Sequence, residues 1–243
     1  MKKAGLFLVL VFAVFGGGLF AHDKGDLMLN IEPQIGLVFS EVQAKHFESS
    51  SEMGVGAEFA VRGTVHYYFV DFFGLNAGMG LGGHILGSSL FSYKDEDIDY
   101  SYSVTNLLGG VFLNIPLGFR FSFGAFALGA GLTINVPLSS SSSYTETEKL
   151  GSKSETNTIT EDKFSYNPYT GWYFDIGYDL SGIKERQGGF GMLFRLAGSF
   201  DDKIGDVSKD GKLGIEYNKL SMFSMSIVFQ AAVELANLPI GGK

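Results

Sequence analysis

The most regular feature of this 243-residue sequence is the alternation of apolar and polar positions in eight separate segments. In residues 27–39, every second residue from Leu27 to Phe39 is apolar apart from Pro33, and the intervening positions are mostly polar. Side chains of a β-strand point alternately to opposite faces, so this pattern predicts a strand. The same reasoning predicts strands at residues 55–69, 73–85, 107–121, 126–138, 172–180, 190–200 and 223–235.

The charged residues inside these segments decide which face is turned inward. All of them fall on the face opposite to the apolar rows, together with one histidine: Glu32, Glu58, Arg62, His66, Arg120, Asp175, Asp179, Arg195 and Glu234. A charge that faces lipid costs roughly 2 to 4 kcal/mol near the bilayer midplane, which explains why no apolar row is interrupted. The polar rows are also rich in Gly, Ala, Ser and Asn, which suit a narrow lumen. The pattern therefore predicts an all-β transmembrane barrel with its apolar face outside.

The connections between the expected strands alternate in length. Long segments at residues 41–53, 88–102, 139–170 and 201–218 alternate with short ones at 70–72, 122–124 and 181–188. Membrane barrels have short periplasmic turns and long extracellular loops. We expect a single up-and-down antiparallel barrel of about eight strands with both chain ends in the periplasm. The longest segment carries a serine run and many charges without an apolar period, so we expect a solvated loop there.

The first 21 residues have the pattern of a cleaved secretory signal peptide. Lys2 and Lys3 precede an apolar stretch, and Ala21 offers a small residue for cleavage before His22. An uncleaved anchor helix is the alternative, but three consecutive glycines interrupt the stretch. We therefore expect a signal peptide at residues 1–21 and one barrel domain at residues 22–243, exported to the outer membrane.

Composition narrows the class of partner. The chain has no cysteine, which excludes disulfides, thiolate metal sites and a lipid-modified N-terminal cysteine. Its formal net charge is -8, and the clustered Lys and Arg that bind nucleic acid are missing. The expected partners are the outer-membrane lipid bilayer and the machinery that assembles barrels in it. Small solutes, or host and environmental ligands at the loops, are further candidates, and we expect a monomer.

One hairpin resembles a known family. Residues 114–121, with the sequence Asn-Ile-Pro-Leu-Gly-Phe-Arg-Phe, precede the glycine-rich residues 124–132 across a short turn. This arrangement resembles a hairpin of small outer-membrane β-barrel proteins of the OmpW-like and porin-like families. The resemblance implies an eight-stranded barrel and the passage of small or apolar solutes. Many such barrels end on an aromatic residue, whereas this chain ends on Lys243, which puts the usual assembly signal in doubt.

The inward charges are the main candidate site, and they allow two interpretations. If the first two strands pair, Glu32 lies close to Arg62, and such pairs either fill the lumen as a salt-bridge plug or line a conducting path. The first interpretation favours a surface-exposed structural or adhesive barrel, and the second favours a narrow porin-like channel. Eight-stranded barrels generally have interiors filled by side chains.

Two other patterns point to chemistry more weakly. His84, Ser88 and Ser89 near the end of the third strand, with Glu58 as an orienting acid, are the minimum for a lipid-modifying enzyme, but their spacing is not diagnostic. Residues 206–211 resemble the start of a calcium loop, but Tyr217 stands where a carboxylate is expected. We expect no enzymatic activity, no cofactor and no metal site.

Overall fold

The computed structural model describes residues 22–44, 52–161, 164–180, 188–202, 204–207 and 217–237. The signal peptide expected at residues 1–21 lies outside the described residues. The strands are β1 (Asp26–Ala44), β2 (Glu52–Val70), β3 (Phe73–Asp95), β4 (Tyr100–Phe123), β5 (Phe126–Leu150), β6 (Lys153–Glu161), β7 (Phe164–Tyr166), β8 (Tyr169–Asp179), β9 (Gly188–Ser199), β10 (Gly205–Val207) and β11 (Tyr217–Asn237).

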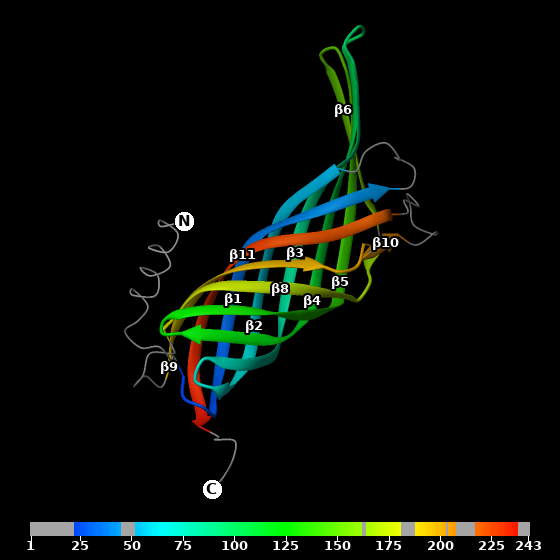
Figure 1. Ribbon diagram of the computed structural model, residues 1–243. Helices are drawn as coiled ribbons and strands as arrows, with labels where there is room; N and C mark the ends of the chain where they lie inside the picture. The colour runs from blue at the N-terminus through cyan, green and yellow to red at the C-terminus, as the bar shows by residue number, and fades with distance from the viewer. Residues whose placement is uncertain are drawn as a thin grey trace, which may run out of the picture.

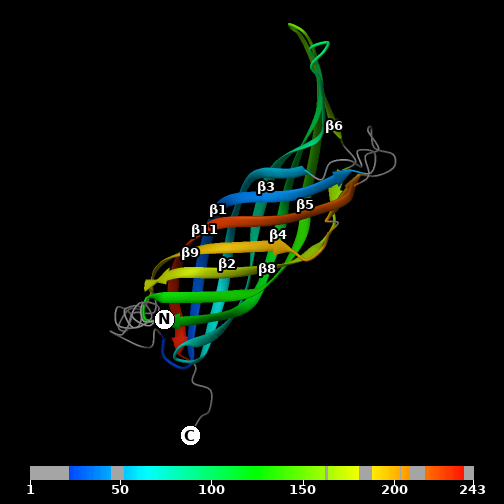
Figure 2. The same cartoon turned by 45° about the horizontal axis from the view of Figure 1, so that its top comes forward.

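Eight of these strands close into a ring in which every neighbour is antiparallel. The order is β4-β3-β2-β1-β11-β9-β8-β5, and β5 pairs with β4 to complete the circle (Figures 1 and 2). The first and last strands of the ring pair from Asp26 with Asn237 to Ala44 with Tyr217. The prediction of an all-β up-and-down barrel with eight strands is confirmed.

Large apolar side chains cover the outside of this ring. Ile35, Leu117 and Phe190 have 62%, 59% and 75% of their surface exposed, and every strand of the ring contributes similar residues. An apolar belt around a closed sheet is the surface that a lipid bilayer requires, because strands that pair with both neighbours hydrogen-bond their backbone groups within the ring. Among the described residues, no helix has the length and apolar character needed to cross a membrane.

The two ends of the barrel differ. At one end, β2–β3 and β4–β5 are joined by two-residue turns, and Gly124 occupies the second turn with a φ of 58°, a conformation that glycine adopts without strain. We call this the turn end. At the other end, the β3–β4 and β5–β6 hairpins project well beyond the remaining strands in both views (Figures 1 and 2). We call these projecting hairpins, residues 91–104 and 143–160, the extension.

The extension corrects the expectation of long solvated loops at residues 88–102 and 139–170. Residues 88–95 belong to β3 and residues 139–150 to β5, so most of both segments is strand. A bulge at Leu138 explains why the alternation does not reveal the second half of β5. Val111 pairs with Ser139 while Phe112 pairs with Pro137, so odd-numbered residues of β5 point inward before the bulge and even-numbered residues after it. Only the base of the extension, at Val104 and Tyr144, is buried in the apolar interior, and beyond this base its strands need no apolar row. Cross-strand pairing holds them instead.

Two short strands pair apart from the ring. β7 and β10 form a small antiparallel sheet in which Tyr166 pairs with Gly205 and Phe164 with Val207. Both strands come from segments that we expected to be loops. The calcium-like sequence at residues 206–211 falls partly on β10, and its residues 208–211 lie outside the described residues.

Candidate functional site

The inside of the barrel is divided into a polar half and an apolar half. The half nearer the turn end holds the buried charged residues, and the half nearer the extension holds buried Val, Leu, Phe and Tyr side chains. Both halves come from the inward rows of the same strands. The site is therefore built from side chains that alternate with the lipid-facing residues.

Arg195 of β9 is the centre of the polar half. Its Nε and Nη2 donate to the two carboxylate oxygens of Asp175 on β8 at 2.6 and 2.7 Å, a bidentate ion pair. Its Nη1 donates to Oε1 of Gln34 at 3.2 Å, and its Nη2 lies 3.5 Å from Oε2 of Glu32. The guanidinium carbon lies 4.8 Å from the ring centroid of Tyr173. Because β11 separates β9 from β1, these bonds cross part of the lumen.

Gln34 extends this cluster to β2. Its Oε1 also accepts a hydrogen bond from Nη1 of Arg62, and its Nε2 donates to Oε1 of Glu58 at 2.6 Å. The hydroxyl of Thr64 donates to Oε1 of Glu32 at 2.9 Å. We call the connected side chains the ionic network: Glu32, Gln34, Glu58, Arg62, Thr64, Asp175 and Arg195.

Two further contacts bridge the lumen nearby, and a third lies within β2. Arg120 of β4 donates from Nη2 to Oδ2 of Asp179 on β8 at 2.7 Å. The Tyr173 hydroxyl donates to Oδ1 of Asn76, which lies on β3 on the other side of β4 and β5. His66 Nε2 lies 3.0 Å from the Thr64 hydroxyl. Paired charges and hydrogen-bonded side chains therefore fill this half of the barrel, although single atoms such as Arg62 Nε, His66 Nδ1 and Arg120 Nε are buried without a hydrogen-bond partner.

The apolar half is closed by residues that do not belong to the ring. Phe164 and Tyr166 of β7, together with Ile204, pack into the cluster formed by inward residues of β1, β3, β4, β5 and β11. We call these three residues the cap. The Tyr166 hydroxyl lies 2.8 Å from Nε2 of His84, whose ring stacks on Phe112 with a centroid distance of 5.0 Å.

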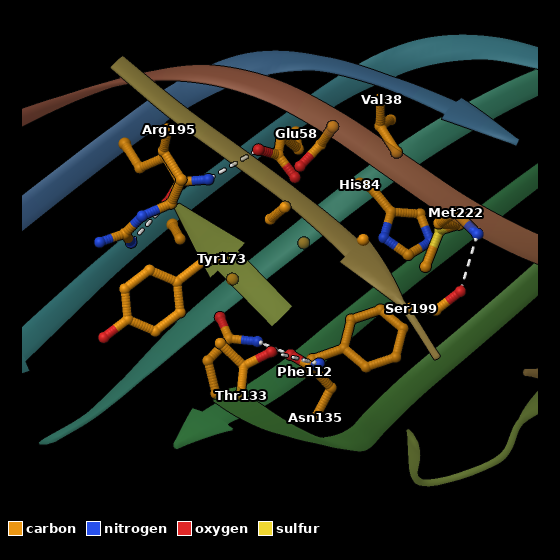
Figure 3. A pocket seen from close by; sticks show the side chains of 18 of the residues that line it. Val38, Glu58, His84, Phe112, Thr133, Asn135, Tyr173, Arg195, Ser199 and Met222 are labelled. Atoms are coloured by element: carbon orange, nitrogen blue, oxygen red, sulfur yellow. Dashed lines mark hydrogen bonds between the residues drawn. The ribbon is translucent and has the colours of Figure 1, made fainter. Parts of the chain in front are cut away.

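A small cavity of about 80 Å³ lies between the two halves. In Figure 3, Arg195, Tyr173 and Glu58 lie toward one side of it, and His84, Met222 and Ser199 lie toward the other. A separate groove on the barrel near the extension end shares five lining residues with the cavity, namely Trp172, Gly198, Ser199, Met222 and Phe223. The wall between the cavity and the groove is therefore only one layer of residues thick.

Unequal strand lengths explain this thin wall. β5 pairs with β8 only as far as Asn135 and Tyr169, and β11 pairs with β9 only as far as Phe223 and Gly198. Beyond these pairs β5 stays paired with β4 and β11 with β1, but β8 and β9 no longer lie between them, which leaves a notch in the ring. Residues near the cap partly fill the notch, since Ile204 and Leu220 are joined by a backbone hydrogen bond of 3.0 Å.

The structure distributes the nine candidate residues unevenly. Glu32, Glu58, Arg62, Asp175 and Arg195 lie in the ionic network, Arg120 and Asp179 form a separate pair, and His66 lies beside Thr64 and Glu32. Glu234 is half-buried and lies outside the network. Glu32 and Arg62 are register partners, yet the Arg62 guanidinium donates to Gln34.

Neutral polar residues complete the site, and the sequence reasoning did not single them out. Gln34, Thr64 and Tyr173 contact the charged residues directly, and Asn76 accepts a hydrogen bond from Tyr173. Their only sequence signal is their position on the inward rows.

The weaker patterns do not form a catalytic group among the described residues. No hydrogen bond joins His84 to Ser88 or Ser89, and no three His, Cys, Asp or Glu side chains in this part of the chain are grouped so that they could hold a metal ion. His84 is instead bonded to the cap through Tyr166.

The fold defines a small eight-stranded β-barrel of the outer-membrane type. No protein-family model matches the chain, and no curated protein matches it. Similar solved structures include the outer membrane protein OprG from Pseudomonas aeruginosa, with 14% identity, coverage of 87% of this chain and 97% of that chain, and a TM-score of 0.41. The outer membrane protease OmpT from Escherichia coli has 7% identity, coverage of 86% and 97%, and a TM-score of 0.35. Ail, the attachment invasion locus protein of Yersinia pestis, has 10% identity, coverage of 86% and 99%, and a TM-score of 0.28. Likeness at this level carries no argument about activity, and the narrower OmpW-like resemblance stays a prediction.

Proposed function

We propose that this protein is an integral outer-membrane barrel with a closed lumen that presents its extension to the surroundings of the cell. In this role the barrel is a rigid, non-catalytic anchor, and the extension is the part that meets a partner. A barrel with a filled interior suits an anchor because nothing has to pass through it.

The burial of the lumen charges is the observation that supports this proposal. A water-filled pore leaves its polar lining exposed to solvent. Here most of the charged and histidine side chains are almost fully buried: Glu32 2%, Arg62 7%, His66 1%, Arg120 3%, Asp175 5%, Asp179 3% and Arg195 4% exposed, whereas Glu58 and Glu234 are partly exposed. The hydrogen bonds from Arg195 to β1 and from Tyr173 to β3 cross the space that a pore would need.

Conductance in planar bilayers tests the closed lumen. We expect purified wild-type protein to be silent, and we expect Asp175→Ala/Arg195→Ala to give small conductance steps because it empties the centre of the network. A matched control is Thr156→Ala on β6, which lies outside the ring and leaves the network intact. Conductance steps of equal size in the wild type and the double variant would contradict the proposal.

Orientation is tested by labelling, which is simple because the chain has no cysteine. Outer-membrane barrels place their short turns in the periplasm, so the extension is expected outside. Thr156→Cys in the extension should react with a membrane-impermeant maleimide on intact cells. Asp71→Cys in the β2–β3 turn should react only after the outer membrane is permeabilised. The reverse pattern would refute the orientation.

The notch supports a second candidate function, in which a small apolar solute passes between the lipid-facing groove and the lumen cavity through the wall. The five residues shared by the groove and the cavity are the observation that favours it. A bulky residue at this point, Ser199→Trp, should then slow the uptake of an apolar dye into proteoliposomes. Thr105→Trp, on an exposed position of β4, is the size-matched control. Equal uptake by both variants would argue against the route.

A further inference from the structure

The extension has two chemically different faces. Tyr93, Tyr102, Glu148 and Glu155 are consecutive register partners on β3, β4, β5 and β6, so they form one row on one face. Tyr100 and Glu146 lie two residues from this row on the same face. We call these six residues the tyrosine–glutamate face. The opposite face of the same strands is composed mainly of serine and threonine.

Tyrosines and glutamates on this face are paired with one another. Tyr100 is hydrogen-bonded to Glu148, and Tyr102 is hydrogen-bonded to Glu146. A phenol donates to a carboxylate, so these bonds leave both negative charges in place. The pKa of both phenols is raised above the usual value. The larger cause is partial desolvation, and the smaller one is the negative charge of the nearby carboxylates. The rings of Tyr93 and Tyr100 are 6.2 Å apart between centroids and lie side by side.

The carboxylates of this face form no ion pair among the described residues, although Lys153 lies on the same face two residues from Glu155. The ion pairs of the structure include Lys94 with Glu96 on the β3–β4 hairpin, but none involves Glu146, Glu148 or Glu155. Glu148 lies directly opposite Glu155, and like charges at directly opposed positions destabilise a sheet. A bound cation would remove this repulsion. The chain also has a net charge of -8, which attracts cations to the surface.

We propose that the tyrosine–glutamate face binds an extended, basic segment of a partner protein, with arginine side chains at alternate positions. An arginine guanidinium stacks on a tyrosine ring and donates in a fork to a carboxylate, and this face offers both groups together. Alternate residues of an extended chain are about 6.6 to 6.8 Å apart, which matches the spacing of successive rows on the face. A divalent metal ion is a poorer fit because no metal-holding group occurs in the described part of the chain.

This inference rests on the proposed function, since it requires the extension to face outward. The test uses full-length protein in nanodiscs of uncharged phosphatidylcholine and a fluorescent peptide of alternating arginine and serine, with binding followed by anisotropy. Glu146→Gln/Glu148→Gln should weaken binding about tenfold, because two charges that meet the guanidinium groups are removed. Tyr102→Leu keeps both charges and should weaken binding about threefold through the lost ring.

The matched control is Glu96→Gln/Asp97→Asn, which removes two charges from the exposed β3–β4 turn and should change affinity less than about twofold. Equal weakening by the two double variants would overturn the proposal, because it would show unspecific attraction to an acidic protein. So would a wild type that fails to bind the peptide, or calcium displacing the peptide equally from the wild type and from Tyr102→Leu.

Two readouts keep this proposal separate from the proposed function. Heat-modifiable mobility on gels shows that each variant is a folded barrel. If Thr156→Cys is labelled on intact cells but the peptide does not bind, the basic-segment inference fails and the surface role stands. If Thr156→Cys is not labelled, the proposed function itself fails.

Discussion

Replacing Asp175 by asparagine is the most direct test of the closed lumen. The carboxylate accepts two short hydrogen bonds from Arg195, and both side chains are about 95% buried, with exposed fractions of 6% and 4%. Asp175→Asn keeps the shape but removes the charge and turns an amide donor toward the guanidinium. Breaking a buried pair at one partner typically costs 3 to 5 kcal/mol. Because Arg195 keeps Gln34 and Glu32 as acceptors, we expect about 3 kcal/mol.

The assay is urea unfolding of the protein in phosphatidylcholine vesicles, followed by fluorescence. Trp172 is the only tryptophan in the chain and lies on β8 three residues from Asp175, so its emission reports this region directly. In Asp175→Asn/Arg195→Met both charges are absent, and stability should return to within about 1 kcal/mol of the wild type. A loss below about 1 kcal/mol in Asp175→Asn would refute the reasoning, because it would mean that water already screens the pair.

Three further predictions follow from other parts of the barrel. Leu117→Arg puts a charge on the lipid face and should lower the free energy of unfolding by about 2 to 4 kcal/mol in the same urea assay, if the residue lies near the bilayer midplane. Gly131→Ala should destabilise the barrel by about 1 to 3 kcal/mol, because the added Cβ would overlap the carbonyl oxygen of Leu117, whereas Gly63→Ala, with its nearest neighbour at 4.0 Å, should change stability little. Glu146→Gln should lower the raised pKa of Tyr102, so the phenol should ionise at a lower pH in an ultraviolet titration referenced to Tyr102→Phe. The hydrogen bond of the Tyr102 phenol should therefore stabilise the folded protein fully at a pH below the pKa that the phenol has in the unfolded chain. This stabilisation should be lost as the pH rises through the higher pKa that the phenol has in the folded protein.

The sequence was sufficient to predict the ring because lipid imposes a strict rule on it. Each strand of the ring must keep one face apolar, so the alternation in residues 27–39 already marks most of β1. The extension is not subject to that rule. Beyond Val104 and Tyr144, which are buried, its strands are not covered by lipid or by the lumen. The bulge at Leu138 also changes which residues of β5 point inward, just before the serine run begins. Nothing in the local pattern therefore separates residues 139–161 from a loop.

The partners within the lumen could not be predicted for a different reason. The sequence shows which residues point inward, but the stagger of the ring determines which of them share a level. Arg195 and Gln34 are 161 residues apart and meet only because β9, β11 and β1 are staggered as they are. Glu32 and Arg62 are neighbours in register, as expected from the hairpin, yet each finds closer partners from other inward positions.

The cap has a consequence for how the barrel is assembled. Phe164, Tyr166 and Ile204 contribute nothing to the ring, so all eight strands can pair while the extension end of the lumen is still open to water. Arg195 and Asp175 can then find each other as hydrated ions, when the cost of a wrong pairing is small. If the cap docks after the ring has closed, it excludes water from the ion pairs beneath it and strengthens them. A charged interior could then form without a stage in which unpaired charges are buried.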